Sequence, residues 1–577
     1  MEPVLSVNNL SISFGKAPAT RVVQDVGFEL FPGETLALVG ESGSGKTLTA
    51  LSIMGLLPKA ATICTGNILL RGKGGDTIPV LTSSAKQLQA IRGKQVAMIF
   101  QEAGNALNPV MTCGRQITET ILCHQKCGKS TARKKTISLL KEVQLQDPER
   151  IYHAYPHELS GGQKQRVMIA MALSCNPSVI LADEPTSALD VTVQKGIIEL
   201  LRELQQKHRI SILFISHDLE LVKGFANRVL VMYQGRVVEQ KAVDELFTKA
   251  EHPYTKGLIQ CRPPHGLRLR QLPTVADFLN PEQVVADFFH PDNIISDSER
   301  KTHITQMMAG KPFAGVKNLV VRFSGSGWRL SRKITAVDDV SFDVYPGEML
   351  GVVGESGSGK TSLSRAFLRL IEPEKGSIFI GNREITSLNG RQLRANRKFA
   401  QIVFQDPYAA LNPLKTIGQT LMEPLVIHES KLSNAERKAR AIHYLQLVGL
   451  RPDYFDRYPH ALSGGQRQRI AIARALILAP EFLILDEPVS SLDVSVQAQI
   501  INLLTTLRAQ MGFTSIFISH DLNLVRSIAD RIIVMKEGRI VEIAEADTLF
   551  SKPSSDYTKQ LIQALPGYPG NTNSHVS

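Results

Sequence analysis

The chain contains two copies of an eight-residue loop whose composition suits a phosphate group. GESGSGKT occurs at residues 40–47 and again at 354–361, each time after a short apolar run and before a segment of helical periodicity. Glycines let backbone N–H groups surround phosphate oxygens, and a helix N-terminus adds a favourable dipole. The candidate phosphate-binding residues are Gly40, Ser42, Gly43, Ser44, Gly45 and Lys46 in the first copy and Gly354, Ser356, Gly357, Ser358, Gly359 and Lys360 in the second.

The last two residues of each loop have side chains with separate roles in this chemistry. Lys46 and Lys360 are predicted to reach the β and γ phosphates of a nucleotide, and the hydroxyls of Thr47 and Thr361 to hold Mg²⁺. A single G-x4-GK[ST] match can arise by chance. Two matches in the same strand-turn-helix context make a chance origin negligible.

An acidic pair ends another apolar run in each copy. Asp183 and Glu184 follow VILA, and Asp486 and Glu487 follow FLIL. Ligands bind at the carboxyl ends of strands in open α/β sheets, so each aspartate is expected to organise Mg²⁺ and each glutamate to polarise the attacking water. Paired acids can also merely cap a strand, but the Gly-rich loop in the same copy favours the catalytic interpretation.

A glutamine and a histidine after further apolar runs complete each set. The candidates are Gln101 and His217 in the first copy and Gln405 and His520 in the second. Each histidine follows the acidic pair's glutamate by 33 residues, which supports contact with the γ-phosphate. A lone histidine after a strand is more often structural. The glutamine amides are predicted to contact the metal or the water.

The strands and helices that position these residues must occur twice, because the chain is a tandem duplication of one domain of roughly 250 residues. Apolar runs at 35–39, 179–181 and 212–215 alternate with longer helical segments, which predicts an α/β fold with a mainly parallel sheet in each copy. The first copy carries extra length, and residues 71–76 are the expected insertion. We predict domains at 1–265 and 313–565, a linker with short helix at 266–312, and a polar tail at 566–577.

Composition is that of an ordinary globular protein. Of 577 residues, 43% are hydrophobic and 21% charged, which excludes a disordered or disulfide-scaffold chain. There is no apolar run of spanning length and no secretory signal pattern, so a cytoplasmic protein is expected. The net charge of +12 is scattered over both halves, and no nucleic-acid partner is expected. Six cysteines form no CxxC pair, which fits free thiols in a reducing compartment.

Together the motifs resemble the ATP-binding subunits of ABC transporters, here with two nucleotide-binding domains in one chain. LSGGQ, at 159–163 and 462–466, is that family's diagnostic motif. The resemblance implies ATP and Mg²⁺ as cofactors, and an antiparallel β subdomain and a helical subdomain beside each core sheet. In the family, the LSGGQ of one domain completes the ATP site of the other. The residues implied to face the ATP held by Lys360 are Ser160, Gly161, Gly162 and Gln163, and those implied to face the ATP held by Lys46 are Ser463, Gly464, Gly465 and Gln466.

The same resemblance assigns further residues around each ATP. Phe14 and Phe323 are placed to stack on adenine, with core packing as the alternative for both. The D-loops are expected at 187–190 and 490–493. Because both halves carry the full Lys, Gln, Ser, Glu and His set, we expect two hydrolysing sites, with ATP-driven closure of the two domains and hydrolysis reopening them.

Finer features resemble the peptide/opine/nickel uptake group of ABC proteins. They are the segments 101–109 and 405–413, the segments 189–194 and 492–497, and HPYT at 252–255 with its echo at 556–558. The group imports di- and oligopeptides, glutathione, nickel or metal-chelator complexes and peptide-like antibiotics. It uses two permeases and a solute-binding protein, which implies a peripheral location on the cytoplasmic side of the inner membrane. Glu102-Ala103 departs from the group's usual Asp-Pro, so contacts with one permease are expected to differ.

The sequence fits two other functional classes of the ABC superfamily less well. A translation-associated ABC ATPase typically has a highly charged helical linker and the sequence EPTNHLD in its D-loop segment. This chain has EPTSALD and EPVSSLD in the D-loop segments, and its linker contains prolines at 273, 281 and 291. A DNA-repair ATPase requires zinc-binding CxxC insertions, which the sequence lacks.

Overall fold

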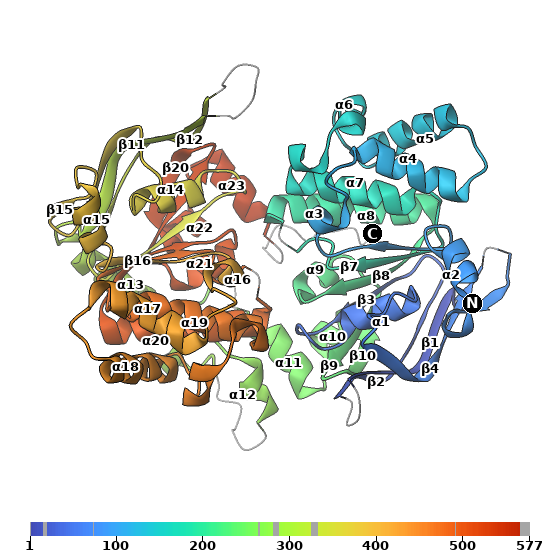
Figure 1. Ribbon diagram of the computed structural model, residues 1–577, viewed down its shortest axis with the longest axis horizontal. Coiled ribbons are helices and arrows are strands. Elements are labelled where there is room, and N and C mark those ends of the chain that lie inside the picture. Colours follow the sequence, from blue (N-terminus) through green and yellow to red (C-terminus); the bar gives the residue numbers. More distant parts are fainter. Residues whose placement is uncertain are drawn as a thin grey trace. The chain divides into compact units, whose positions relative to one another are not determined.

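The computed structural model describes residues 2–15, 20–72, 74–187, 189–262, 266–280, 288–324, 333–490 and 492–565 (Figure 1). It divides into two compact units. Unit 1 comprises 1–259 and 278–280, and unit 2 comprises 260–277 and 281–577. The polar tail expected at 566–577 and parts of the expected linker lie outside the described residues. The domain and linker boundaries derived from the sequence stay predictions.

Within the described residues, unit 1 has a six-stranded sheet of order β10-β9-β3-β8-β7-β6 and a four-stranded sheet of order β2-β1-β4-β5. In the larger sheet all neighbours pair in parallel except β9 and β10. The smaller sheet is antiparallel. The strands are β1 Leu5–Phe14, β2 Thr20–Leu30, β3 Thr35–Val39, β4 Ala61–Arg71, β5 Thr77–Pro79, β6 Val96–Ile99, β7 Val179–Asp183, β8 Ser211–Ser216, β9 Arg228–Tyr233 and β10 Arg236–Ala242.

Unit 2 repeats this plan in the part of it that the structure describes, with a sheet of order β16-β17-β18-β13-β19-β20 and another of order β12-β11-β14-β15. Again one antiparallel pair, β19 with β20, closes an otherwise parallel sheet. The strands are β11 Ala314–Ser324, β12 Lys333–Val344, β13 Met349–Val353, β14 Lys375–Ile380, β15 Arg383–Glu384, β16 Ala400–Val403, β17 Phe482–Asp486, β18 Thr514–Ile518, β19 Arg531–Lys536 and β20 Arg539–Glu545.

Helices connect and cover these sheets. Those of the first half are α1 Lys46–Ile53, α2 Ala85–Ile91, α3 Ala103–Ala106, α4 Cys113–His124, α5 Lys129–Glu142, α6 Pro148–His153, α7 Gly161–Leu173, α8 Val191–His208, α9 Leu219–Lys223, α10 Val243–Thr248, α11 Pro253–Gln260 and α12 Val275–Leu279. Those of the second half are α13 Asp297–Met308, α14 Lys360–Phe367, α15 Gly390–Asn396, α16 Pro407–Ala410, α17 Ile417–His428, α18 Asn434–Leu447, α19 Gly464–Leu476, α20 Val494–Met511, α21 Leu522–Ile528, α22 Ala546–Ser551 and α23 Asp556–Gln563.

The fold class expected from the sequence is confirmed. The apolar runs at 35–39, 179–181 and 212–215 lie in β3, β7 and β8, whose residues are all buried, as parallel strands covered on both faces require. The α4, α5 and α6 helices pack together as the helical subdomain of unit 1, and α17 and α18 do so in unit 2. Part of the extra length of the first copy lies where the sequence placed it, because β4 ends at Arg71 and β5 begins at Thr77, whereas β14 ends at Ile380 and β15 begins at Arg383.

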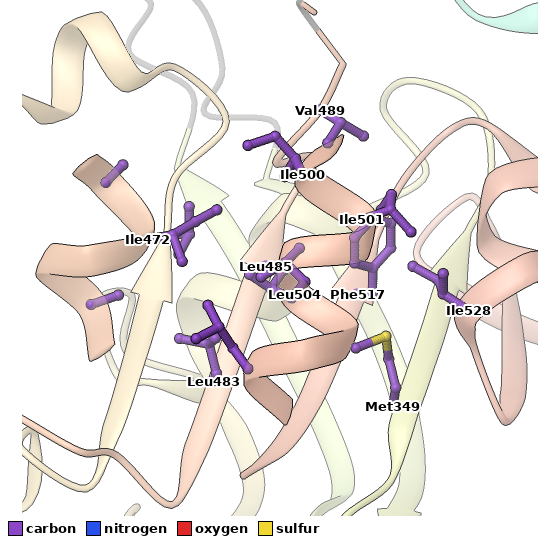
Figure 2. Packing of buried hydrophobic residues seen from close by; sticks show 14 of the residues in the cluster. Met349, Ile472, Leu483, Leu485, Val489, Ile500, Ile501, Leu504, Phe517 and Ile528 are labelled. Carbon is purple, nitrogen blue, oxygen red and sulfur yellow. The ribbon is translucent and has the colours of Figure 1, made fainter. Parts of the chain in front are cut away.

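The core of unit 2 explains why its longest helix lies on the parallel sheet. Figure 2 shows Ile500, Ile501 and Leu504 of α20 beside Leu485 of β17 and Phe517 of β18. The three residues of α20 recur at helical period and therefore lie on one face of the helix. The residues of β17 and β18 lie near the carboxyl ends of their strands, so one face of the helix packs on one face of the sheet. The packing fixes the carboxyl ends of β17 and β18, where the candidate catalytic residues follow.

Candidate functional site

Each Gly-rich loop joins the central strand of its sheet to the helix that follows. Gly45 is the N-cap of α1 with φ 101°, and Gly359 is the N-cap of α14 with φ 102°. A Cβ on Gly45 would lie 2.9 Å from Val23 Cγ2, and one on Gly359 would lie 2.2 Å from the carbonyl oxygen of Ala336. Left-handed backbone and close approach of β2 or β12 therefore both require glycine here.

The remaining loop residues adopt the same geometry in both copies. The glycines with positive φ are Gly40, Gly43, Gly354 and Gly357. The backbone N–H groups of Ser44 and Ser358 each donate to the carbonyl three residues earlier, at 3.1 Å, which tightens the turn. Ser42 and Ser356 are exposed at the loop tip. Two loops from one sequence pattern thus form matching concave turns with N–H groups at a helix start, the arrangement that binds phosphate.

The loop lysines are folded back onto the turn. Lys46 Nζ donates to the carbonyl oxygens of Gly40 at 2.7 Å and Glu41 at 2.8 Å. Lys360 Nζ donates to the corresponding carbonyls of Gly354 and Glu355 at the same distances. Both lysines are buried, so each ammonium group is held inside the turn within reach of an anion bound there.

The loop threonines reach the strand-end aspartates. Thr47 Oγ1 donates to Asp183 Oδ1 at 3.2 Å, and Thr361 Oγ1 lies 3.5 Å from Asp486 Oδ1. Burial raises the pKa of Asp183 to about 6, an effect that the Thr47 hydroxyl partly opposes. Burial likewise raises the pKa of Asp486. A buried carboxylate beside a hydroxyl is a hard-oxygen donor set that a divalent cation would stabilise.

The two glutamates occupy strained positions just beyond β7 and β17. Glu184 has φ 45° and Glu487 has φ 47°, and left-handed backbone is costly for a residue with a Cβ. Each is held there by its backbone N–H, which donates to Ile215 or Ile518 of the neighbouring strand at 3.0 Å. The strain points to a functional requirement for the side-chain direction.

Around each glutamate the predicted glutamine and histidine converge. Gln101 Nε2 donates to Glu184 Oε2 at 3.1 Å, and His217 Nδ1 lies 3.1 Å from the same oxygen. Burial opposes ionisation of Glu184, but the His217 hydrogen bond and the charges of His217 and Lys46 outweigh it, so the pKa of Glu184 lies below its ordinary value. The glutamate is therefore held as the carboxylate.

The second site has the same arrangement. Gln405 Nε2 donates to Glu487 Oε2 at 2.9 Å, and His520 Nδ1 lies 3.5 Å from that oxygen. Burial again opposes ionisation, and the interactions with His520 and Lys360 lower the pKa of Glu487. The structure thus brings together the Thr, Asp, Glu, Gln and His that the sequence singled out, once in each unit.

The LSGGQ segments lie apart from these hydrogen-bonded clusters, at the starts of α7 and α19. Ser160 and Ser463 are N-caps that form capping boxes with Gln163 and Gln466, so these hydrogen bonds lie within the motif itself. Ser160 is exposed. Each motif is a glycine-rich helix start, where backbone N–H groups favour an anion.

The glycines of the motif also meet a packing requirement. A Cβ on Gly162 would lie 2.7 Å from Val193 Cγ1 of α8, and one on Gly465 would lie 2.5 Å from Val496 Cγ1 of α20. Gly161 and Gly464 have more room, with the nearest side-chain atoms at 3.3 and 3.4 Å. Close approach of two helix starts explains the second glycine of each pair.

The D-loop residues link the glutamates to the next helix. Ser187 Oγ donates to the Glu184 carbonyl at 3.0 Å, and Ser490 Oγ to the Glu487 carbonyl at 3.1 Å. Asp190 and Asp493 are the N-caps of α8 and α20. Ala188 and Ser491, which belong to the same predicted segments, lie outside the described residues.

The two candidate adenine-stacking residues occupy matching register positions. Phe14 pairs with Thr20 across β1 and β2, and Phe323 pairs with Ile334 across β11 and β12. The Phe14 side chain is half-buried and that of Phe323 is 40% exposed, so neither is a core residue. Stacking on adenine stays a prediction for both.

Three supporting residues escaped the sequence analysis. The Tyr254 hydroxyl accepts a hydrogen bond from the Glu41 N–H at 2.9 Å, and the Tyr557 hydroxyl accepts one from the Glu355 N–H at 3.3 Å. The signal was available, because both tyrosines lie in the repeated segments 252–255 and 556–558. Ser364 Oγ donates to Asp486 Oδ2 at 3.2 Å, and comparison of the two copies would have shown alanine at position 50 instead.

No helix in the described ranges combines the length and the apolar character needed to cross a bilayer.

The profile of the family described as "ABC transporter" matches residues 23–187 and 337–490. A second profile, "Oligopeptide/dipeptide transporter, C-terminal region", matches 238–283 and 541–574.

Three curated relatives resemble the chain over almost its whole length. All are described as "Glutathione import ATP-binding protein GsiA". The Salmonella choleraesuis (strain SC-B67) protein is 44% identical over 569 residues, and those of Escherichia coli O157:H7 and Shigella dysenteriae serotype 1 are 45% identical over 573 residues. Each match covers 98% of this chain and 89% of the relative.

Proposed function

This chain belongs to the ABC transporter family, as an ATP-binding protein with two ABC domains, and on that premise we propose that it hydrolyses ATP at two sites to drive import of glutathione or a closely similar small peptide. Its activity is ATP hydrolysis coupled to solute transport. We assign the two nucleotide-binding domains to 1–265 and 313–565, joined by the linker 266–312.

The proposed roles follow from the contacts in each unit. The Gly-rich loop and its lysine bind the phosphates. Glu184 and Glu487, kept ionised by their histidines, accept hydrogen bonds from water and orient it toward the γ-phosphate, while Gln101 and Gln405 fix the carboxylates. Mg²⁺ fits the hydroxyl and carboxylate oxygens of Thr47 and Asp183 and their second-copy equivalents, with Gln101 and Gln405 nearby, and it would neutralise charge on the phosphates.

Partners follow from the family, since an importer's ATP-binding subunit acts on membrane permeases. We propose two permease subunits and a solute-binding protein, with this chain peripheral on the cytoplasmic face of the inner membrane. Support comes from exposed apolar side chains on the segments after Gln101 and Gln405, because permease helices need an apolar surface to grip. Val110 is 78% exposed and Leu414 is 84% exposed.

The solute class rests on one observation, the 44–45% identity with glutathione import ATP-binding proteins over 98% of the chain. The match to the oligopeptide/dipeptide C-terminal region supports the same class. Glutathione is itself a tripeptide, so the two comparisons agree. A translation-associated function is not favoured.

The proposal is tested by uptake of radiolabelled glutathione in cells of the source organism that lack this chain. We expect uptake to be lost, to return with the wild-type chain, and to stay absent with Glu184→Gln/Glu487→Gln. A labelled dipeptide and Ni²⁺ serve as competing solutes. Unchanged glutathione uptake would contradict the solute. Co-purification of ribosomal proteins without permeases by the ATP-loaded double variant would contradict the transport function as a whole.

A further inference from the structure

A cavity of about 500 Å³ lies within unit 2, and none of the ATP-site residues described above lines it. Segment 268–272 and helix α13 form one side, and the end of α20 with residues 527–530 forms the other. Its apolar wall includes Leu272, Ile304, Ile501 and Ile528, the last two labelled in Figure 2. The cavity therefore has room and apolar surface for a small organic molecule.

Arginines crowd the polar end of this cavity around one carboxylate. Arg508 Nη2 lies 2.7 Å from Asp530 Oδ2, and Arg268 Nη2 lies 3.9 Å from Asp530 Oδ1. Arg268 also donates to the carbonyl oxygens of Ile528 and Ala529 at 2.6 and 2.9 Å. Arg300, only 8% exposed, contacts Asp547, a carboxylate that Arg526 shares at 3.4 Å.

The acidic groups do not balance the cationic ones. Arg270 lines the cavity too, but Glu299 pairs with it at 2.7 Å and cancels its charge. His303 lies 3.9 Å from Asp530. The four remaining arginines, Arg268, Arg300, Arg508 and Arg526, face three aspartates, Asp530, Asp547 and Asp297, the last of which acts on Arg300. Arginines thus outnumber aspartates in this partly buried place, where burying guanidinium groups close together is costly.

Two further observations single out Arg300 and Arg268. Arg300 Nε is buried and has no hydrogen-bond partner among the residues that the structure describes. Burial, and after it the charge of Arg268, lowers the pKa of Arg300 to about 10. Burial also lowers the pKa of Arg268. Both guanidinium groups are therefore destabilised as cations, and an anion beside them would relieve this.

The fold itself does not require these charges, because unit 1 makes the same backbone contacts with neutral side chains. At the equivalent positions Gln205 donates to the Gly33 carbonyl at 2.9 Å, as Arg508 does to Gly347, and Asn227 accepts from the Thr35 N–H at 2.9 Å. Asp530 accepts from the Met349 N–H at the same distance. The charge cluster is thus a feature of unit 2, where segment 268–272 and α13 pack.

We propose that this cavity binds a small organic anion, with its carboxylate or phosphate group between Arg268 and Arg300 and its apolar body against Ile501 and Ile528. Guanidinium groups bind both oxyanions in the same bidentate way. The ligand would join segment 268–272 and α13 to the body of unit 2. The inference goes beyond the proposed function and does not depend on the transported solute.

The test is calorimetric titration of the full chain, loaded with Mg·ADP to fill the ATP sites, using phthalate and phenyl phosphate as probes and neutral phthalamide as the control. We expect phthalate, phenyl phosphate or both to bind and phthalamide not to bind. The preferred probe separates a carboxylate ligand from a phosphate ligand. Arg300→Gln should weaken binding of that probe at least tenfold, as should Arg268→Gln.

Asp530→Asn distinguishes a ligand site from a structural cluster. The asparagine keeps an acceptor for the Met349 N–H, as Asn227 does in unit 1, yet removes a competing negative charge, so probe binding should tighten severalfold. Arg270→Gln, whose charge Glu299 already cancels, should change it less than twofold. The proposal would be overturned if neither anion bound. It would also be overturned if the Asp530→Asn chain still bound ADP, and was therefore folded, but bound the probe more weakly than the wild-type chain.

Discussion

At the scale of single residues, Glu184 and Glu487 are subject to opposing influences. Burial disfavours their carboxylate forms, and the histidine beside each favours them strongly enough to lower the pKa. Each aspartate one position earlier lacks a histidine, and its pKa is raised. Neighbouring carboxyl groups with pKa values pushed apart are typical of divided roles, one for proton chemistry and one for a cation.

Replacing both histidines should therefore change the pH dependence of ATP hydrolysis. Without the imidazoles of His217 and His520, burial would raise the pKa of each glutamate, so the acid limb of the kcat profile should move to higher pH. Activity at neutral pH should fall about a hundredfold, the scale for losing a group that supports proton transfer. The measurement is steady-state ATPase activity of His217→Ala/His520→Ala from acidic to neutral pH.

The chain supplies a matched control for this prediction. His208 Nε2 lies 2.7 Å from Glu142 Oε1, the same kind of pair outside the site, and the pKa of Glu142 is also lowered. His208→Ala should leave the acid limb in place. A lower rate with an unmoved acid limb in the double variant would mean that the histidines act on the phosphate and leave the carboxylate's ionisation unaffected.

At the scale of elements, α11 and α23 fix the Gly-rich loops from a distance in sequence. The Tyr254 hydroxyl accepts the Glu41 N–H, and the Tyr233 ring packs against Tyr254 with centroids 4.2 Å apart. A loop that is fixed before ATP arrives loses less conformational freedom on binding. These helices therefore contribute to ATP affinity through the loop backbone.

Tyr254→Phe should weaken ATP binding at the first site about fivefold, since it removes one hydrogen bond worth about 1 kcal/mol. The measurement is equilibrium ATP binding in a Lys360→Ala background, which leaves only that site. Tyr557→Phe, in a Lys46→Ala background, should have a smaller effect because its hydrogen bond is longer, at 3.3 Å.

Tyr233→Phe controls for the loss of a hydroxyl as such. Its hydroxyl accepts a hydrogen bond from the exposed Gln234 side chain, and its removal should not change ATP affinity. Equal weakening in Tyr233→Phe and Tyr254→Phe would show that the effect is not specific to the hydrogen bond with Glu41, and would contradict the prediction.

The same elements show what sequence reasoning can reach. Lys46, Asp183 and His217 were predictable because each chemical type follows an apolar run at a repeated distance, and parallel strands bring their carboxyl ends together. The repeat marked the segment that contains Tyr254, but its contact with the loop was not predictable, since nothing local relates a tyrosine in α11 to a loop 213 residues earlier. The role of Arg508 and Asp530 in the cavity was not predictable for the same reason, because it depends on the packing of α13 beside them.

At the scale of the whole molecule, the duplication matters because each unit carries both an ATP-binding loop and an LSGGQ helix start. If the family's arrangement applies, one unit alone holds two half-sites and no complete one. Ser463 would then serve the nucleotide at Lys46, and Ser160 the nucleotide at Lys360. Both serines are exposed N-caps at a helix start, where backbone N–H groups and the helix dipole favour an anion.

Ser463→Arg should lower nucleotide trapping in unit 1 about tenfold and spare unit 2, because loss of the helix-start contact costs about 1.4 kcal/mol. Ser160→Arg should do the reverse. The measurement uses azido-ATP with Mg²⁺ on the Glu184→Gln/Glu487→Gln chain, cleavage in the linker, and mass spectrometry of the two labelled halves. Ser433→Arg, at the N-cap of α18 with the same capping box, controls for damage to a helix start. Loss of label in the unit that carries the substitution would mean that each unit completes its own site, and the two-unit closure mechanism would fail with it.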